Sequence, residues 1–375
     1  MEIARDILTE IQEVLFKDKV IVIYGTRRVG KTTLAKHLLE EYPDKRSEYF
    51  NCEDAQVRRL LEDPTIEKFR RAFFQHDLVV FDEAQVVSNI GFSLKLLHDS
   101  FPELQIIATG SSSFELSNKI GEPLVGRARY FTLYPFSLNE INTSFLQTDS
   151  GIEHILRFGL YPTVINKSEK EMRREIVDIT NGYLYKDIFA LEGLKHSQLF
   201  TDLLTKLALQ VGSEVSYNEL ASSLRLSIET LQKYIELLEK CFVLFVLPAF
   251  SRNLRKEVGK KTRKIYFYDL GVRNAIINQF ASLNLRSDVG ALWENFCIAE
   301  LIKKAHNKGF FPNNYFWRTY DGKEIDFIEE FDGILRAYEF KYSPNQKVKL
   351  PKIFVEEYRP QFSAINRENY AEYLL

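Results

Sequence analysis

Cysteine is scarce in this chain of 375 residues: there are three, standing far apart at Cys52, Cys241 and Cys297. Three widely spaced cysteines build neither a disulfide framework nor a cysteine metal cluster, and they suit a reducing compartment. Long apolar runs are missing too, since the longest, Cys241–Phe250, is too short to span a bilayer. The N-terminal sequence MEIARDILTE is charged and helical in pattern, unlike a signal peptide. We therefore expect a cytoplasmic protein with no membrane partner.

Excess charge of one sign is also missing, because the formal net charge is −2. No global field then attracts the chain to nucleic acid, and any basic surface must be local. What the chain does have is length and apolar content: 45% of its residues are hydrophobic, enough for roughly two to four domains with real cores.

The stretch from Val20 to Leu34 predicts a phosphate-binding loop. Residues 20–24 are β-branched or aromatic and predict a buried strand, residues 25–32 spell G-x-x-x-x-G-K-T, and a helical pattern follows. Backbone N–H groups of such a loop and the helix N-terminus attract phosphates. Lys31 would reach the β- and γ-phosphates and Thr32 would ligate Mg²⁺. The predicted nucleotide-binding residues of the loop are Gly25, Thr26, Arg27, Arg28, Val29, Gly30, Lys31, Thr32 and Thr33.

Two later strands end in polar residues. The first ends at Asp82 and Glu83, and the second runs into Thr109 and Ser111. Strands alternating with helices predict an α/β fold with a parallel sheet and helices on both faces, whose ligands bind at the carboxyl ends of the strands. Asp82 would hold Mg²⁺ and Glu83 would polarise the attacking water. The turn with Thr109 and Ser111 would sense the γ-phosphate, or is simply a serine-rich turn.

Arg127 follows this turn and precedes the next short strand. It would contact the γ-phosphate of its own or a neighbouring subunit, and the nearby Arg129 is the alternative. Action on a neighbour would require a homo-oligomer.

The segments GTRRVGKTTL, VVFDEAQ and IIATGSSS resemble the AAA-type prokaryotic ATPases that carry a second conserved domain, of uncharacterised function, at the carboxyl end. The resemblance covers essentially the whole chain. It implies ATP and Mg²⁺ as ligands, with adenine favoured over guanine. It also implies an ATPase core (1–150), a helical lid or linker (151–198), a winged helix (199–270) and a nuclease-like domain (271–375).

Residues 199–270 predict a winged helix from their pattern as well. A capping box opens a helix at Ser216, Arg225-Leu226 form a turn, and a second helix follows. The segment 251–264 has seven basic residues and one acidic residue and would be the wing. It would contact DNA phosphates, or the module would bind a protein. Acidic residues on the second helix (Glu229, Glu236 and Glu239) disfavour base readout.

The C-terminal region predicts a β-hairpin with the two-residue turn Asp332-Gly333. Counting outward from this turn places Asp326 opposite Glu339 and Glu324 opposite Lys341. Two carboxylates that face each other are destabilising unless a metal ion, a proton or a lysine compensates them.

This pattern resembles the PD-(D/E)xK nuclease superfamily. The resemblance implies that Glu294, Asp326 and Glu339 ligate Mg²⁺ and that Lys341 helps to activate water. The alternatives are a nuclease-type fold without activity, and a solvated hairpin in which Glu324 pairs with Lys341 and Asp326 faces water.

We therefore predict a regulatory ATPase that hydrolyses ATP and controls a DNA-binding or nuclease-like C-terminal region. A nucleotide-gated signalling or scaffold switch with protein partners is the alternative. An oligomeric motor is the third hypothesis and depends on Arg127 acting in trans.

Overall fold

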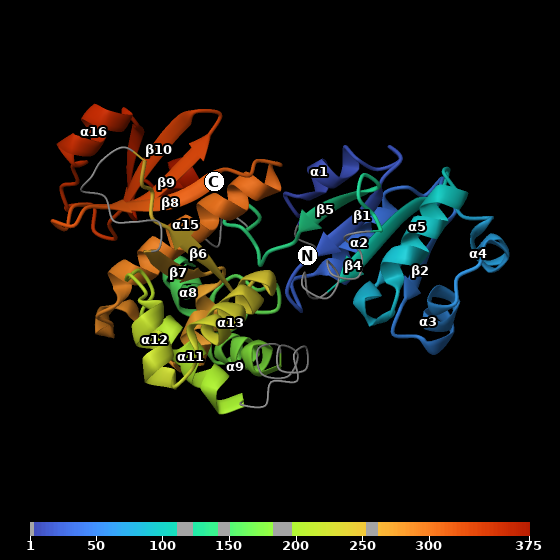
Figure 1. Ribbon diagram of the computed structural model, residues 1–375, viewed down its shortest axis with the longest axis horizontal. Helices are drawn as coiled ribbons and strands as arrows, with labels where there is room; N and C mark the ends of the chain where they lie inside the picture. The colour runs from blue at the N-terminus through green and yellow to red at the C-terminus, as the bar shows by residue number, and fades with distance from the viewer. Residues whose placement is uncertain (1–3, 111–122, 142–150, 183–196, 253–261) are drawn as a thin grey trace. The chain divides into compact units, whose positions relative to one another are not determined.

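The computed structural model describes residues 4–110, 123–141, 151–182, 197–252 and 262–375. The chain divides into two compact units (Figure 1). Unit 1 consists of Met1–Tyr134 and Lys240–Phe242, and unit 2 of Pro135–Glu239 and Val243–Leu375. Within the described residues, no helix is both long and apolar enough to cross a bilayer.

Unit 1 contains a five-stranded, fully parallel sheet with the order β2-β3-β4-β1-β5, which confirms the predicted α/β sheet. Its strands are β1 (Val20–Tyr24), β2 (Ser47–Asn51), β3 (Leu78–Asp82), β4 (Gln105–Gly110) and β5 (Ala128–Thr132). Its helices are α1 (Leu8–Gln12), α2 (Lys31–Glu40), α3 (Ala55–Glu62), α4 (Ile66–Phe73), the 3₁₀ turn η1 (Ala84–Val86) and α5 (Ile90–Ser100).

Alternation along the strands sends side chains to two separate layers of helices. Val22 and Val79 pack with residues of α3, α4 and α5, such as Phe69 and Leu94. α2 contacts β2, β3 and β4. The three inner strands β1, β3 and β4 are buried along their whole length, as expected for a parallel sheet covered on both faces.

Unit 2 begins with a helical region and a small hairpin. The elements are α8 (Gly151–Phe158), α9 (Glu169–Thr180), α11 (Ser197–Leu209), α12 (Tyr217–Leu224), α13 (Ile228–Lys240), β6 (Leu244–Pro248), β7 (Arg263–Phe267) and α14 (Leu270–Ile276). Arg225 adopts a left-handed conformation (φ 54°) between α12 and α13, as a tight turn requires, and β6 pairs antiparallel with β7.

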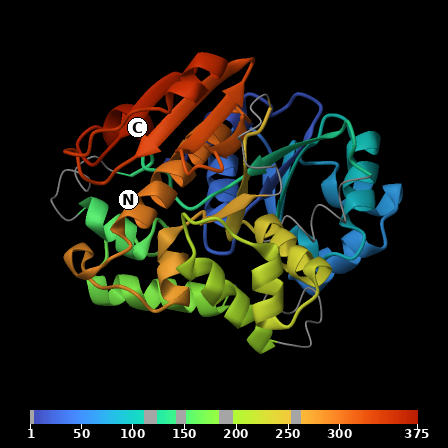
Figure 2. The same ribbon diagram turned by 60° about the vertical axis from the view of Figure 1, so that its left-hand side comes forward.

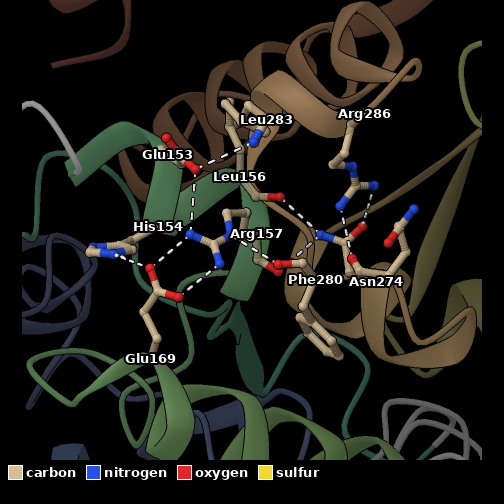
Figure 3. Close-up of polar contacts among 10 residues, drawn as sticks. Glu153, His154, Leu156, Arg157, Glu169, Asn274, Phe280, Leu283 and Arg286 are labelled. Carbon is tan, nitrogen blue, oxygen red and sulfur yellow. Dashed lines mark hydrogen bonds and ion pairs between the residues drawn. The ribbon is translucent and has the colours of Figure 1, made fainter.

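A polar network centred on Arg157 joins α8, α9 and α14 (Figure 3). Arg157 forms two hydrogen bonds of 2.8 Å with the Glu169 carboxylate and one of 3.0 Å with the Phe280 carbonyl. Asn274 of α14 donates to the carbonyl oxygens of Leu156 and Arg157. Because Arg157 is 7% exposed, these bonds satisfy a buried cation and fix the three helices against each other.

The rest of unit 2 is a four-stranded sheet of order β11-β10-β9-β8 with α15 beside it in both views (Figures 1 and 2). Its elements are η3 (Leu283–Leu285), α15 (Val289–Asn307), β8 (Asn313–Arg318), β9 (Glu324–Phe331), β10 (Ile334–Phe340), α16 (Lys352–Tyr358), β11 (Gln361–Ile365) and α17 (Tyr370–Leu374). Asp332 (φ 49°) and Gly333 (φ 77°) form the turn, and Phe331 lies opposite Ile334 as predicted.

Candidate functional site

The phosphate loop lies between the end of β1 and the start of α2. Gly30 precedes α2 in a left-handed conformation (φ 99°). A Cβ at Gly25 would lie 2.3 Å from the carbonyl oxygen of Leu133, so no larger residue fits there. Arg28, between them, is also left-handed (φ 63°). The two glycines of the motif are therefore required by backbone geometry, and successive turns of this kind direct N–H groups inward.

Lys31 is 4% exposed and lies inside the loop. Its Nζ donates to the carbonyl oxygens of Gly25 (3.0 Å) and Thr26 (2.9 Å). Burial lowers the pKa of Lys31 to about 8, against the opposing influence of Glu83 and Asp82. A buried ammonium of this kind is well placed to exchange carbonyl partners for phosphate oxygens.

Asp82 brings together residues from three further elements. Its Oδ2 accepts hydrogen bonds from Thr32 Oγ1 (2.7 Å) and from Tyr49 OH (2.5 Å), and its Oδ1 accepts one from Thr109 Oγ1. Thr32, Asp82 and Thr109 were predicted from separate motifs, and the structure places them in contact. Tyr49 was missed. Tyr49 lies in β2, the neighbour of β3, so its hydroxyl can reach Asp82. The order of the strands in the sheet cannot be predicted from the sequence pattern, so this contact was not expected.

Glu83 follows β3 in a left-handed conformation (φ 53°), unusual for a residue other than glycine. Its backbone N–H donates to Thr109 Oγ1 (3.2 Å), and its carboxylate accepts a hydrogen bond from Gln85. The Glu83 side chain is therefore oriented by a neighbour that sequence reasoning did not single out. Ser111 lies outside the described residues.

Arg5 is a second contact that the motifs do not predict. Its guanidinium donates to the carbonyl oxygens of Val29 (2.7 Å) and Tyr134 (2.6 Å). It thus braces the phosphate loop from the segment that precedes α1.

Arg127 does not lie near this site. Val20 N donates to the Arg127 carbonyl oxygen (2.9 Å), and β1 runs parallel to β5 with Val20 opposite Ala128. Arg127 is therefore at the edge of the sheet where strands begin, and the phosphate loop is where they end, roughly 15 Å away. Its guanidinium binds Asp99 through bonds of 2.7 and 3.1 Å. A contact of Arg127 with the nucleotide of its own subunit was a wrong prediction.

The C-terminal hairpin brings Asp326, Glu339 and Lys341 together. Lys341 Nζ lies 3.2 Å from Asp326 Oδ2 and 3.0 Å from Glu339 Oε2. Asp326 also accepts a hydrogen bond from Phe340 N (2.9 Å). Burial, followed by the charge of Asp326, raises the pKa of Glu339 to about 7. Lysine is thus one compensating group for the facing carboxylates.

Glu324 does not lie opposite Lys341, so that prediction was wrong. The β9–β10 ladder ends at Phe327 and Tyr338, and a β-bulge interrupts the pairing of β8 with β9. Glu324 pairs with Arg318 of β8 and forms an ion pair with Lys264. The solvated hairpin, with Asp326 facing water, is also wrong, because Asp326 is 7% exposed.

Glu294 is held by two residues of β7. Lys264 Nζ lies 3.1 Å from its Oε1, and Tyr266 OH donates to the same oxygen (2.5 Å). Burial raises the pKa of Glu294. Across the described ranges, no three or more His, Cys, Asp or Glu side chains form a group that can hold a metal ion. The expected ligand set Glu294, Asp326 and Glu339 does not fit a metal in this arrangement, because Glu294 is bound to Lys264 and Tyr266.

The predicted wing falls mostly on residues 253–261, which lie outside the described residues. Of the acidic residues on α13, Glu239 turns inward and accepts a hydrogen bond from Val246 N (3.0 Å). Glu239 is thus half-buried, whereas Glu229 and Glu236 are exposed. That these acidic residues disfavour base readout stays a prediction.

Three family models match consecutive parts of the chain. Residues 17–142 match an AAA domain, residues 150–283 a domain of unknown function (DUF8612), and residues 289–371 a second domain of unknown function (DUF4143). The first match agrees with the sheet and loop of unit 1, which has an AAA-like P-loop fold. The predicted domain boundaries at 150, 198 and 270 stay predictions.

Two relatives that match most of the chain are described as uncharacterized proteins. The uncharacterized protein MJ1544 of Methanocaldococcus jannaschii is 26% identical over 87% of this chain and 75% of its own length. The uncharacterized protein Rv2008c of Mycobacterium tuberculosis is 26% identical over 90% of this chain and 73% of its own length. Among solved structures, the Walker-type ATPase PABY2304 of Pyrococcus abyssi is 17% identical, with a TM-score of 0.48, over 72% of this chain and 95% of that one.

Proposed function

We propose that unit 1 binds ATP with Mg²⁺ and hydrolyses the γ-phosphate. The observation that carries the proposal is the contact of Thr32, Asp82 and Thr109 beside the buried Lys31. A nucleotide-binding loop alone would need neither the carboxylate pair Asp82-Glu83 at the end of β3 nor Thr109 of β4. Both lie at the carboxyl edge of the sheet, where ligands of parallel sheets bind. The likeness of residues 17–142 to AAA domains supports the same assignment.

Each residue has one task in this proposal. Loop N–H groups and Lys31 bind the β- and γ-phosphates, and Glu83, oriented by Gln85, accepts a proton from the attacking water. Thr32 and Asp82 offer hard oxygen ligands within 2.7 Å of each other, a donor set that suits Mg²⁺. When bound, Mg²⁺ neutralises charge that develops on the phosphates.

Phosphate release from ATP tests the proposal. Lys31→Ala removes the phosphate-binding cation, and we expect loss of both ATP binding and turnover. Glu83→Gln removes the base, so turnover should fall ~10²-fold or more while ATP still binds. Lys17→Ala and Glu13→Gln, which change exposed residues of the same types, are the matched controls. Turnover of Glu83→Gln equal to that of the controls would remove Glu83 as the base.

We further propose that the bound nucleotide controls unit 2, and a nuclease there is the second candidate function. The observation that favours it is the joint contact of Asp326, Glu339 and Lys341. The binding of Glu294 by Lys264 and Tyr266 argues against a three-carboxylate metal site and favours the protein-switch alternative. Plasmid cleavage with Mg²⁺ or Mn²⁺, measured with and without ATP, distinguishes the nuclease from the protein switch. If the wild type cuts the plasmid no better than Lys341→Ala does, the nuclease is excluded.

DNA and protein remain the two candidate partners of the basic segment 251–264, which we propose to be a wing. Neutralising Arg255, Lys256, Lys260 and Lys261 should weaken binding to a fluorescent duplex and flatten its salt dependence. An unchanged salt slope excludes DNA as the partner of this segment. Arg127 remains a candidate for contact with a neighbouring subunit in a homo-oligomer, which would require it to leave Asp99.

A further inference from the structure

A pocket of about 480 Å³ lies between the C-terminal part of α15 and the β9–β10 hairpin. Its volume is within the range of small-molecule sites. Apolar side chains form much of its lining, contributed by the helix, by the loop after it and by the hairpin: Leu301, Ala305, Phe310, Pro312 and Phe331. Asp326, Glu339 and Lys341 do not line it, so this pocket is separate from the candidate nuclease residues.

Two aromatic rings form one wall. Phe310 and Phe331 meet edge to face with ring centroids 5.5 Å apart. Phe310 is nevertheless 51% exposed, although a phenylalanine in a packed pair would normally be covered more fully. This wall offers an aromatic surface to a flat apolar group.

The charges around the pocket are unbalanced. Three cationic residues line it, Lys304, Lys308 and Arg336, against one carboxylate, Glu329. Lys304 already donates to the backbone oxygens of Tyr373 and Leu375, both at 2.7 Å. Among the described residues, Lys308 and Arg336 form no ion pair and are exposed at the pocket.

Glu329 offsets only part of this positive charge, because one carboxylate, which lies opposite Arg336 on the neighbouring strand, faces three cationic residues. It is 7% exposed and accepts a hydrogen bond from Tyr338 OH (2.8 Å). Burial raises the pKa of Glu329, against the opposing influence of the Tyr338 hydrogen bond and of the charges of Arg336 and Lys304. The pocket therefore combines apolar walls, a buried hydrogen-bonded floor and more cationic than anionic side chains, with Lys308 and Arg336 both exposed.

We propose that this pocket binds a small organic anion. Its flat apolar body lies against Phe310 and Phe331, and its carboxylate or phosphate group contacts Lys308 and Arg336. The site depends on no residue of the phosphate loop, so it stands whether or not unit 1 hydrolyses ATP.

Fluorescence of 8-anilinonaphthalene-1-sulfonate, an aromatic anion, reports binding to the full chain. We expect saturable binding that weakens as salt is added, because the two cations are exposed. Unlabelled 2-naphthoate and 2-naphthyl phosphate should displace the probe, and the stronger competitor identifies the preferred head group. The neutral 2-naphthalenemethanol should compete poorly, and equal competition by it overturns the anion assignment.

Variants locate the site. The double variant Lys308→Gln, Arg336→Gln changes two exposed residues and should raise the Kd of the probe ~5- to 10-fold or more. Lys347→Gln, an exposed lysine of the same unit outside the pocket, should leave it unchanged. Ala305→Phe should fill the pocket and abolish saturable binding. The proposal is overturned if the double variant binds the probe like Lys347→Gln, even where Ala305→Phe fails to fold.

Discussion

At the scale of single residues, Asp82 couples the predicted magnesium site to β2 through Tyr49 OH at 2.5 Å. Hydrogen bonds to a metal ligand orient it, and their loss typically weakens metal affinity 10- to 100-fold. We therefore expect Tyr49→Phe to raise the Mg²⁺ concentration that gives half-maximal ATP hydrolysis ~10-fold or more. Tyr320→Phe, at a tyrosine that is 74% exposed, is the control. Identical Mg²⁺ titrations of the two variants would show that Tyr49 does not position Asp82.

Glu339 makes a pH-dependent contribution to stability. Its pKa is raised from 4.5 to about 7 by burial, then by Asp326. Between these pH values the folded chain keeps a proton that the unfolded chain has lost, so the free energy of unfolding falls as pH rises. Glutamine does not titrate, so Glu339→Gln avoids this loss. The free energy of unfolding of Glu339→Gln, relative to that of wild type, should therefore rise by about 2–3 kcal/mol between pH 5 and pH 8.

Urea unfolding in the presence of a chelator measures this change. The two tryptophans of the chain, Trp293 and Trp317, are both fully buried in unit 2, so their fluorescence reports the unit that contains Glu339. Asp321→Asn, at a carboxylate of the same unit that is largely exposed, should show no such gain. The raised pKa would be contradicted if the free energies of unfolding of Glu339→Gln and wild type differed by the same amount at pH 5 and at pH 8.

At the scale of elements, the close packing of α14 on α8 depends on glycine. A Cβ at Gly271 would lie 2.0 Å from the carbonyl oxygen of Phe158 and 2.9 Å from Ile176 Cγ1. The first contact is with backbone and cannot be relieved by a rotamer change. Gly271→Ala should therefore lower the free energy of unfolding of unit 2 by about 3 kcal/mol or more.

Gly290 supplies the matched control for this substitution. It lies in the first turn of α15, where an added Cβ would meet nothing within 4 Å. Gly290→Ala should leave the free energy of unfolding unchanged or raise it by up to about 1 kcal/mol, because alanine restricts the unfolded chain. Equal urea midpoints for Gly271→Ala and Gly290→Ala would mean that α14 can move away from α8 at little cost.

The sequence predicts elements whose signals are local. The phosphate loop is a strand, a turn and a helix in one stretch, and the hairpin register follows from Asp332-Gly333. The prediction that Arg127 contacts the nucleotide of its own subunit was wrong, because the number of residues between Arg127 and a motif does not say at which end of a strand Arg127 lies. The pairing of Lys264 with Glu294 was missed because the two residues come from elements 30 positions apart. Such contacts depend on packing, which no spacing rule contains.

At the scale of the whole molecule, the proposed nucleotide site and both tryptophans belong to different units. Tryptophan fluorescence therefore tests the proposed control of unit 2 directly. A ligand that binds only the folded state stabilises it by up to about 2.7 kcal/mol at 100 times its Kd. If ATP binding is coupled to unit 2, the tryptophan-reported urea midpoint of Glu83→Gln should rise when Mg²⁺ and ATP are added.

Lys31→Ala is the control for this coupling, since it should abolish the rise by removing nucleotide binding rather than hydrolysis. Far-UV circular dichroism, which also reports the helices of unit 1, gives the reference for binding itself. The informative result is a nucleotide shift in the dichroism transition of Glu83→Gln with no shift in its tryptophan transition. It would show that ATP stabilises its own unit alone, and the control of unit 2 by nucleotide would have to be abandoned while the ATPase assignment remained.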